Sequence, residues 1–206
     1  HTRASEGLTG CGMPNYDFEK EVMARGYSAV CGIDEAGRGP LAGNVVAAAV
    51  ILPLDLEIEG LNDSKKLSEK KREALYDVIV EKAIYSIAWA TPKEIDELNI
   101  LNATMLAMRR AVEGLPKKAD FALIDGNCSR GFTIPTQTVV KGDALSMSIA
   151  AASILAKVTR DRQCMALDEQ YPAYGFKGHK GYPTKAHMQK VVELGPCPEH
   201  RKTFLK

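Results

Sequence analysis

The sequence predicts an α/β or α+β layered domain built on a mixed sheet. Two observations support this class. Short apolar runs of strand length come first along the chain, and later strands alternate with amphipathic helical stretches. Apolar residues make up 45% of the 206 residues and charged residues 26%, which is the balance of an ordinary globular domain. This length favours one large domain over several.

The individual elements follow from hydrophobic spacing and from capping residues. Apolar runs predict five strands, which are a run ending at Asp34 and the segments 45–52, 84–90, 121–126 and 136–140. Spacing of three or four residues and helix end signals predict helices at about 17–25, 68–81, 98–112, 142–171 and 184–195. Ser68 and Thr184 carry side chains that cap helix N-termini.

Several classes of protein are disfavoured by composition. Residues 1–14 are polar and aperiodic, as in an expression remnant or a disordered leader, so the folded domain is expected over 15–206. The longest apolar run, 45–52, is too short to span a bilayer, and no secretory signal is found. Five widely spaced cysteines without a Cys-x-x-Cys pair argue against a disulfide framework or a zinc site. We therefore expect a cytoplasmic protein with no membrane contact.

The most informative segment is GIDEAGRGP, residues 32–40. Asp34 and Glu35 stand where an apolar run ends and a glycine-rich turn begins. Neighbouring side chains on a strand point to opposite faces, but at a strand end both can reach one cation. Gly37 and Gly39 let the backbone approach a ligand and present N–H groups to an anion. Metal-binding acids beside a phosphate-binding turn indicate phosphoryl chemistry. The alternative is an acidic surface turn.

Two further acids extend this pattern. Asp125 ends the strand at 121–125, and the carboxyl ends of neighbouring strands line one crevice in open α/β sheets. Asp143 opens the long helix and heads a polar stripe along it, whose other members are Ser146, Ser153, Lys157 and Asp161. The alternative is that the serines bond to backbone carbonyls while Lys157 reaches outward. Four carboxylates are hard ligands, suited to Mg²⁺ or Mn²⁺ rather than zinc, and two such ions can clamp the attacking and leaving oxygens of a phosphodiester.

The end of the chain is basic. Residues 171–206 contain seven Lys or Arg and two Asp or Glu, a balance of +5 in a chain whose net charge is +1. This predicts a polyanionic partner, and the alternative is a solvated basic tail. Within it, segment 174–184 interleaves aromatic, basic and glycine residues, which suits stacking on a sugar or base. The loop 62–68 is polar and basic and precedes a helix, so it is a candidate phosphate contact. Side chains expected to meet phosphates in the basic end are Lys177, Lys180, Lys185 and Arg201.

Eight ordered segments of the chain resemble bacterial ribonuclease HII, the type 2 ribonuclease H. The resemblance covers roughly residues 17–204. The matching segments are GIDEAGRGPLAG (32–43), LNDSKKLSEKKR (61–72), EIDELNILNATMLAM (94–108), LIDGN (123–127), VVKGD (139–143), AAASILAKVTRD (150–161), YGFKGHKGYPTKAH (174–187) and PEHRKTF (198–204). Asn44 and Cys197 depart from many relatives, which have Pro and Ser there.

The resemblance implies a ribonuclease H-like fold, with a five-stranded mixed sheet flanked by helices, and a monomeric enzyme. Its four family acids, both catalytic and metal-binding, fall on Asp34, Glu35, Asp125 and Asp143. The turn that reads the ribose 2′-hydroxyl falls on Gly37, Arg38 and Gly39, and the tyrosine that packs on the ribose on Tyr182. Lys65 and Lys157 fall where the family has basic residues that contact phosphates.

The implied activity is endonucleolytic. The expected substrates are the RNA strand of RNA–DNA hybrids and single ribonucleotides embedded in duplex DNA, cut on their 5′ side. Two Mg²⁺ or Mn²⁺ ions would serve the reaction and leave 5′-phosphate and 3′-hydroxyl ends. The alternatives are a metal-dependent 3′→5′ exonuclease of the same fold and a hybrid-binding protein without turnover.

Overall fold

The computed structural model describes residues 12–206. Residues 1–11, most of the expected leader, lie outside the described part. From Pro14 the chain is packed against the rest of the molecule, because Pro14 is buried and Asn15 forms a parallel bridge with Ser146. Within the described chain, no helix combines the length and the apolar character needed to cross a membrane.

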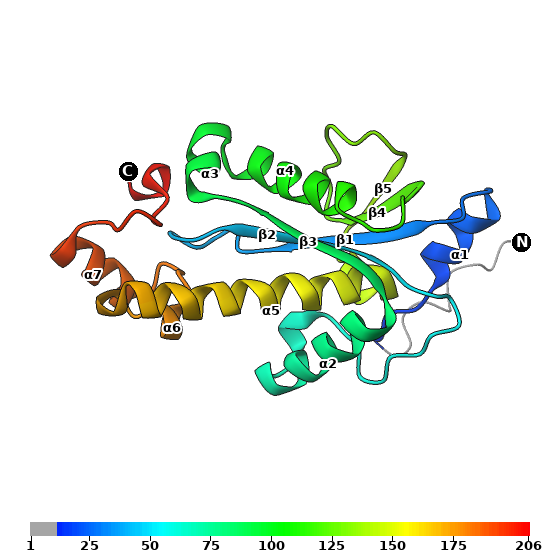
Figure 1. The fold of residues 1–206 in the computed structure, drawn as a ribbon, viewed down its shortest axis with the longest axis horizontal. Coiled ribbons are helices and arrows are strands. Elements are labelled where there is room, and N and C mark those ends of the chain that lie inside the picture. The colour runs from blue at the N-terminus through cyan, green and yellow to red at the C-terminus, as the bar shows by residue number, and fades with distance from the viewer. Residues whose placement is uncertain (1–11) are drawn as a thin grey trace, which may run out of the picture.

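A five-stranded mixed sheet with helices on both faces forms the molecule, as the sequence predicted (Figure 1). The strands are β1 (Val30–Ala36), β2 (Val45–Ile51), β3 (Ile84–Ala90), β4 (Phe121–Asp125) and β5 (Thr136–Val139). The helices are α1 (Asp17–Ala24), α2 (Glu69–Lys82), α3 (Pro92–Leu98), α4 (Ile100–Glu113), α5 (Met147–Gln170), α6 (Phe176–His179) and α7 (Lys185–Leu194). Short 3-10 helices are η1 (Ser64–Lys66), η2 (Gly142–Ala144), η3 (Pro172–Tyr174) and η4 (Lys202–Leu205).

The strand order is β3-β2-β1-β4-β5. β1, β2 and β3 form an antiparallel meander, whereas β4 runs parallel to β1 and β5 parallel to β4. The register pairs Ile33 with Ile124, so the residues that follow them, Asp34 and Asp125, lie side by side near the carboxyl ends of the two strands. The parallel pairing thus places two of the predicted acids next to each other.

Two apolar layers enclose the sheet, with α3 and α4 on one face and α5 and α2 on the other (Figure 1). Alternate residues of β2 serve the two layers: Val45 and Ala47 face α4, and Ala48 and Val50 face α5. A strand that is buried on both faces has no polar alternation, which explains the continuous apolar run in the sequence. The core therefore fixes the relation of α5 to β1 and β2.

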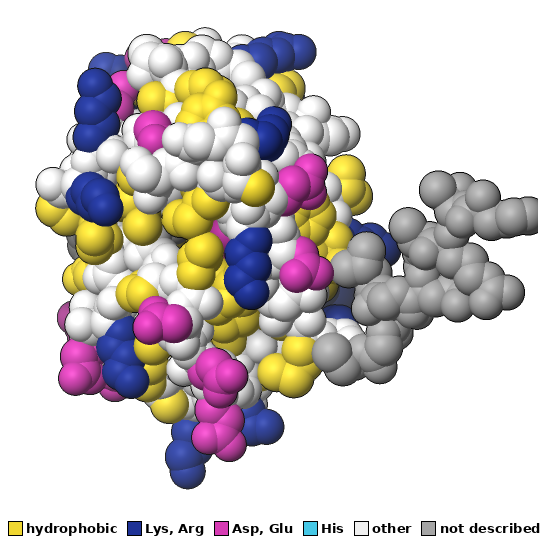
Figure 2. All heavy atoms as spheres, turned by 90° about the vertical axis from the view of Figure 1, so that its right-hand side faces the viewer, with side chains coloured by type: hydrophobic (Ala, Val, Ile, Leu, Met, Phe, Trp, Pro, Cys, Tyr) yellow, Lys and Arg dark blue, Asp and Glu magenta, His cyan; other side chains and the backbone are white. Residues whose placement is uncertain are grey.

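The two ends of the molecule differ in charge. α1 lies at one end of the sheet, and α6, α7 and the C-terminal segment lie at the other (Figure 1). On the α1 end, basic and acidic side chains are interspersed with apolar ones (Figure 2). The excess of basic residues belongs to segment 171–206, which includes α6 and α7.

Two predicted helix boundaries were wrong. The helix expected over 98–112 is α4, which begins at Ile100 because Asn99 adopts φ 68° and separates it from α3, a helix that was not predicted. The long helix expected from residue 142 begins at Met147, and Ser146 caps it by accepting the N–H of Ile149 at 3.3 Å. Asp143 consequently lies in η2, before the helix, and not on the stripe along α5.

β1 and α5 approach each other closely at Gly32, and this contact generates a stability prediction. A Cβ there would overlap the backbone of Ser148 and Ile149. We expect Gly32→Ala to force α5 off the sheet and lower the melting temperature by about 4 °C or more. Gly178→Ala is the matched control, because a Cβ at Gly178 meets nothing within 4 Å, and it should shift the melting temperature by less than about 2 °C. Equal shifts in thermal denaturation of the two variants would refute the close approach.

Candidate active site

All ten site residues predicted from the sequence line one cavity of about 280 Å³. The cavity lies where β1 and β4 end, between α5 and the loop that carries η1. Its acids come from β1, β4 and η2. Its basic residues come from the turn that follows β1, from η1 and from α5. The lining is Asp34, Glu35, Ala36, Gly37, Arg38, Gly39, Ser64, Lys65, Asp125, Asp143, Ser153, Lys157 and Tyr182.

Three of the acids converge closely. One carboxylate oxygen from each of Asp34, Glu35 and Asp125 lies within 4.8 Å of the other two. The Asp34 carboxylate also accepts the N–H of Glu35 at 2.8 Å, which fixes the two adjacent acids relative to each other. Asp143 joins the cluster from η2, where its N–H donates to Asp125 Oδ1 at 3.4 Å. These oxygens are the donor type that binds hard divalent cations.

Burial and mutual repulsion disfavour the ionised form of these carboxyl groups. Burial is the main cause that raises the pKa of Asp34, and the charges of Glu35, Asp125 and Asp143 raise it further. Burial raises the pKa of Glu35, against the attraction of Arg38. Burial and the nearby Asp125 raise the pKa of Asp143 to about 7. Glu35 Oε2 is also buried and finds no hydrogen-bond partner among residues 12–206. A divalent cation would satisfy this oxygen and offset the repulsion.

The loop before α2 contributes an acid that the sequence analysis missed. The Asp63 carboxylate lies against that of Asp143 and adds to the rise of the Asp143 pKa. Asp63 also caps η1, because its Oδ1 accepts the Lys65 N–H at 2.9 Å. Although burial opposes it, the charges of Asp143 and Asp63 raise the pKa of Lys65, which favours the charged ammonium beside these acids. The loop was interpreted only as a phosphate contact, so its acid was overlooked.

Helix α5 forms the floor of the cavity with only part of the predicted stripe. Ser153 Oγ donates to Ser64 Oγ at 2.7 Å, and Lys157 Nζ donates to Asp161 Oδ1 at 2.8 Å. Ser146 lies elsewhere, where its hydroxyl donates to the buried carboxylate of Glu19 at 3.2 Å. Lys157 lines the cavity while it is paired with Asp161, so its charge is already partly compensated.

The glycine turn and Tyr182 together form another wall of the cavity. Gly37 has φ 94°, and a Cβ there would overlap the guanidinium of Arg160, so glycine is required by both conformation and space. A Cβ on Gly39 would lie 3.6 Å from the Tyr182 ring, which shows that the ring faces the turn. Arg38 is half-exposed and its guanidinium lies 3.8 Å from the Glu35 carboxylate.

The prediction that Arg201 contacts phosphate is wrong. Its side chain is 0% exposed, and its guanidinium donates to backbone carbonyls of the segment 37–43. The three histidines of this region, His179, His187 and His200, hydrogen-bond to backbone groups or to each other and are structural. The roles expected for Lys177, Lys180 and Lys185 stay predictions.

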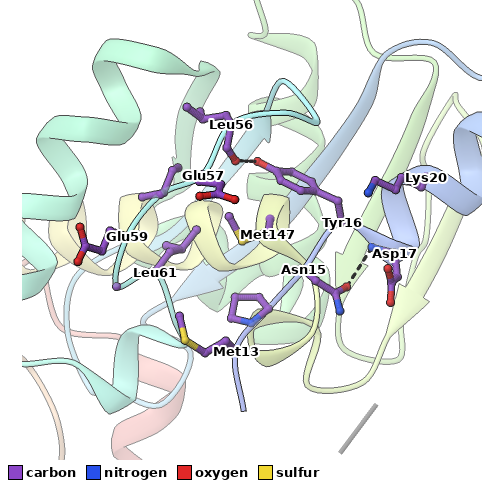
Figure 3. Close-up of a pocket in the computed structure, with 13 residues that line it drawn as sticks. Met13, Asn15, Tyr16, Asp17, Lys20, Leu56, Glu57, Glu59, Leu61 and Met147 are labelled. Carbon is purple, nitrogen blue, oxygen red and sulfur yellow. Dashed lines mark hydrogen bonds between the residues drawn. The ribbon is translucent and has the colours of Figure 1, made fainter. Parts of the chain in front are cut away.

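A larger cavity, of about 670 Å³, lies beside α1 and holds none of the ten predicted residues (Figure 3). Its wall joins α1 to the loop before η1, because the Tyr16 hydroxyl donates to the Leu56 carbonyl at 2.6 Å (Figure 3). Met147 at the start of α5 closes one side. Burial raises the pKa of Tyr16 to about 12, which keeps its phenol neutral. Among the described residues that line it, this cavity has no cluster of convergent acids like that of the smaller one.

Comparison with known proteins agrees with this geometry. A family model described as Ribonuclease HII matches residues 31–206, nearly the whole chain. The chain belongs to the ribonuclease HII family. A ribonuclease HII of Shewanella sp. strain ANA-3 is 59% identical over 192 residues, which cover 90% of this chain and 92% of the relative.

Two solved structures share the fold. Ribonuclease H2 of Pyrococcus horikoshii superposes with a TM-score of 0.72 at 28% identity, covering 85% of this chain and 93% of that one. Ribonuclease HII of Archaeoglobus fulgidus, solved in complex with PCNA, superposes with a TM-score of 0.65 at 25% identity, covering 84% and 94%. The chain is thus a hydrolase, an endoribonuclease of RNA–DNA hybrids. This family membership disfavours both alternatives, the exonuclease and the binding protein without turnover.

The raised carboxyl pKa values generate a prediction for the metal-free protein. The ordinary pKa of the Asp143 carboxyl is 3.8, and in the folded state it is about 7. Between these two pH values this carboxyl is protonated more fully in the folded state than in the unfolded chain. Stability from this group is therefore present at low pH and lost as pH rises through about 7. With chelator present, we expect the melting temperature of the wild type, relative to Asp143→Asn, to fall by about 3 °C or more between pH 5 and 8.

The measurement is paired thermal denaturation of the two proteins across that range. Added Mg²⁺ or Mn²⁺ should raise the wild-type melting temperature more at pH 8 than at pH 5, because the cation competes with protons for the same oxygens. A difference between the two proteins that does not change with pH would contradict the prediction.

Proposed function

We propose that this ribonuclease H also incises duplex DNA on the 5′ side of single embedded ribonucleotides, and that the four acids hold two divalent cations for the reaction. The observation that carries this proposal is the shared cavity, which the acids, the glycine turn and Tyr182 all line. Chemistry and ribose recognition would then act on the same nucleotide. Products with 5′-phosphate and 3′-hydroxyl ends would follow.

The donor set fits Mg²⁺ or Mn²⁺. Its ligand atoms are carboxylate oxygens, and the buried Glu35 Oε2 lacks, within residues 12–206, the hydrogen bond that such an atom normally has. When bound, two such ions supply an activated water nucleophile and stabilise the leaving 3′-oxygen. Asp34, Glu35 and Asp125 would form the central ligand group, and Asp143 would complete it from η2. Asp63 stands behind Asp143, where its charge strengthens cation binding.

Basic residues around the acids would hold the phosphodiester. Lys65, on η1, lies close enough to Asp143 for the two charges to interact. Lys157 lines the floor of the cavity, and Arg38 is half-exposed at its mouth. These three cations can neutralise backbone phosphates, which are common to RNA and DNA, so they would contribute affinity and little selectivity.

Selectivity for a ribonucleotide would come from the wall formed by residues 37–39 and Tyr182. The 2′-hydroxyl is the group that distinguishes RNA from DNA, and a glycine turn lets it approach the backbone. Tyr182 is 42% exposed and its ring faces Gly39, so the ring can pack on the sugar while its hydroxyl stays free to bond.

The first test concerns chemistry. Asp125→Asn keeps the size of the side chain and removes one ligand charge. Because residues that merely orient a metal ligand contribute about 10–100-fold, loss of a ligand should lower kcat by at least about a hundredfold. Binding to the same duplex in Ca²⁺ should change by less than about threefold, because the phosphate contacts remain.

The assay is cleavage of a labelled DNA duplex that carries one ribonucleotide, and Asp77→Asn is the matched control because Asp77 is exposed on α2. The control should cleave like the wild type. Near-normal turnover by Asp125→Asn, or wild-type turnover in excess chelator, would exclude the proposed metal mechanism.

The second test concerns ribose recognition. Tyr182→Ala should lower kcat/KM on the single-ribonucleotide duplex by at least about tenfold, and on a long RNA–DNA hybrid by less than about threefold. The hybrid offers many registers in which a ribose is correctly placed, whereas the single ribonucleotide offers one. Both substrates are measured side by side under the same ionic conditions. Equal losses would show that Tyr182 is a packing residue.

A further inference from the structure

Behind the cavity wall lies a layer of buried polar side chains from the C-terminal segment 197–201. One of them holds the glycine turn, and another holds the backbone of Tyr182. Neither His200 nor Arg201 lines the cavity. Both are buried, at 1% and 0% exposure.

Arg201 binds the turn through four carbonyl oxygens. Its Nη2 donates to Gly37 O at 2.6 Å and its Nη1 to Arg38 O at 3.0 Å. Nη1 also donates to Pro40 O at 2.7 Å and Nε to Gly43 O at 3.0 Å. The planar guanidinium has its donors in a fixed arrangement, so it imposes a shape on the turn that a lysine ammonium cannot impose.

This bonding directs the N–H groups of the turn. In a trans peptide the C=O and the next N–H point in opposite directions. Because Gly37 O and Arg38 O point at Arg201, the N–H groups of Arg38 and Gly39 point away from it, toward the cavity side of the turn. Neither N–H donates a hydrogen bond within the described chain. Two backbone donors without a partner in the described chain thus lie on the cavity side of the turn.

His200 holds the other wall through a chain of hydrogen bonds. The Cys197 N–H donates to His200 Nδ1 at 2.8 Å, which leaves the His200 proton on Nε2. This Nε2–H donates to His187 Nε2 at 2.8 Å, so His187 carries its own proton on Nδ1 and donates it to the Tyr182 carbonyl at 2.9 Å. The bonding therefore fixes the tautomer of each ring and anchors the Tyr182 backbone to the C-terminal segment.

The backbone ties these two anchors together. Ala42 forms an antiparallel bridge with His200, and Arg201 N–H donates to Leu41 O at 2.8 Å. Leu41 N–H in turn donates to Gly181 O at 2.7 Å, next to Tyr182. The turn, the Tyr182 segment and the C-terminal segment thus form one hydrogen-bonded unit.

We propose that Arg201 and His200 are positioning residues, which set the spacing between the Gly37–Gly39 turn and the Tyr182 ring and thereby the selectivity for a ribonucleotide. This inference rests on the proposed recognition of a single ribose by that wall. Arg201 and His200 act through the turn and through Tyr182 and do not touch substrate.

Arg201→Lys tests the first anchor. The lysine keeps the charge but cannot bond four carbonyls at once. We expect kcat/KM on the single-ribonucleotide duplex to fall by at least about tenfold, and on the long hybrid by less than about threefold. The matched control is Arg109→Lys, since the Arg109 guanidinium also donates to a backbone carbonyl, that of Arg130 at 3.0 Å, but lies on α4. The control should cleave both substrates like the wild type.

A double-mutant cycle separates positioning from general loss of structure. If Arg201 acts through the spacing to Tyr182, the double variant Arg201→Lys with Tyr182→Ala should be within about threefold of Tyr182→Ala alone on the single-ribonucleotide duplex. Losses that multiply would overturn the inference, as would an Arg201→Lys variant that cleaves like the control.

His200→Phe provides a second variant in case Arg201→Lys does not fold, because phenylalanine keeps a ring of similar size and removes both hydrogen bonds. It should show the same selective loss and the same lack of additivity with Tyr182→Ala, and a proportional loss on both substrates would overturn the inference. The wild type is measured first. If the wild type does not incise at a single ribonucleotide, the proposed function is wrong and so is this inference. If the wild type incises normally and the variants are unaffected, only this inference is wrong.

Discussion

The parallel pairing of β1 with β4 is the constraint on which the site depends. It aligns the two strands so that Asp34 and Asp125 leave the sheet at one edge, while α5 covers the face behind them. Buried like charges at such short separation destabilise the fold. The apolar layers on both faces of the sheet supply the stability that tolerates this arrangement, and a cation can turn the repulsion into attraction. The buried carboxylates that would bind a metal ion are thus the same groups that destabilise the metal-free site.

Much of this site could be predicted from the sequence because its acids end apolar runs. A strand buried on both faces is a continuous apolar segment, so the charge that terminates it is conspicuous, as at Asp34 and Asp125. Helix starts were less predictable. Ser146 was taken as one more member of a polar stripe, whereas its hydroxyl caps α5 and bonds to Glu19. Thr91, Pro92 and Glu94 carry a complete start signal for α3, but this helix was not predicted, because the apolar spacing was followed only from Leu98 onward.

Buried polar residues were the least predictable. Sequence reasoning counted Arg201 as part of a basic, solvent-exposed end, because a linear charge balance treats every arginine alike. Its burial is decided by carbonyl oxygens from more than 150 residues earlier in the chain. Arg160 is buried behind the same turn and donates to the carbonyls of Ala42 and Lys180. Neither guanidinium has a carboxylate partner within residues 12–206, so carbonyl dipoles compensate both charges and leave the cavity acids free for other ligands.

The reliance of the turn on Arg201 also orders events during protein synthesis. The ribosome delivers the chain from its N-terminus, and domains fold as their segments emerge. Every residue of the sheet and all four cavity acids are made before Arg201. A nascent chain can therefore assemble the acidic cluster while the carbonyls of Gly37 and Pro40 still lack their guanidinium. The wall that we propose to recognise ribose is completed late, so a chain interrupted before this residue would contain the acids without that wall in its final shape.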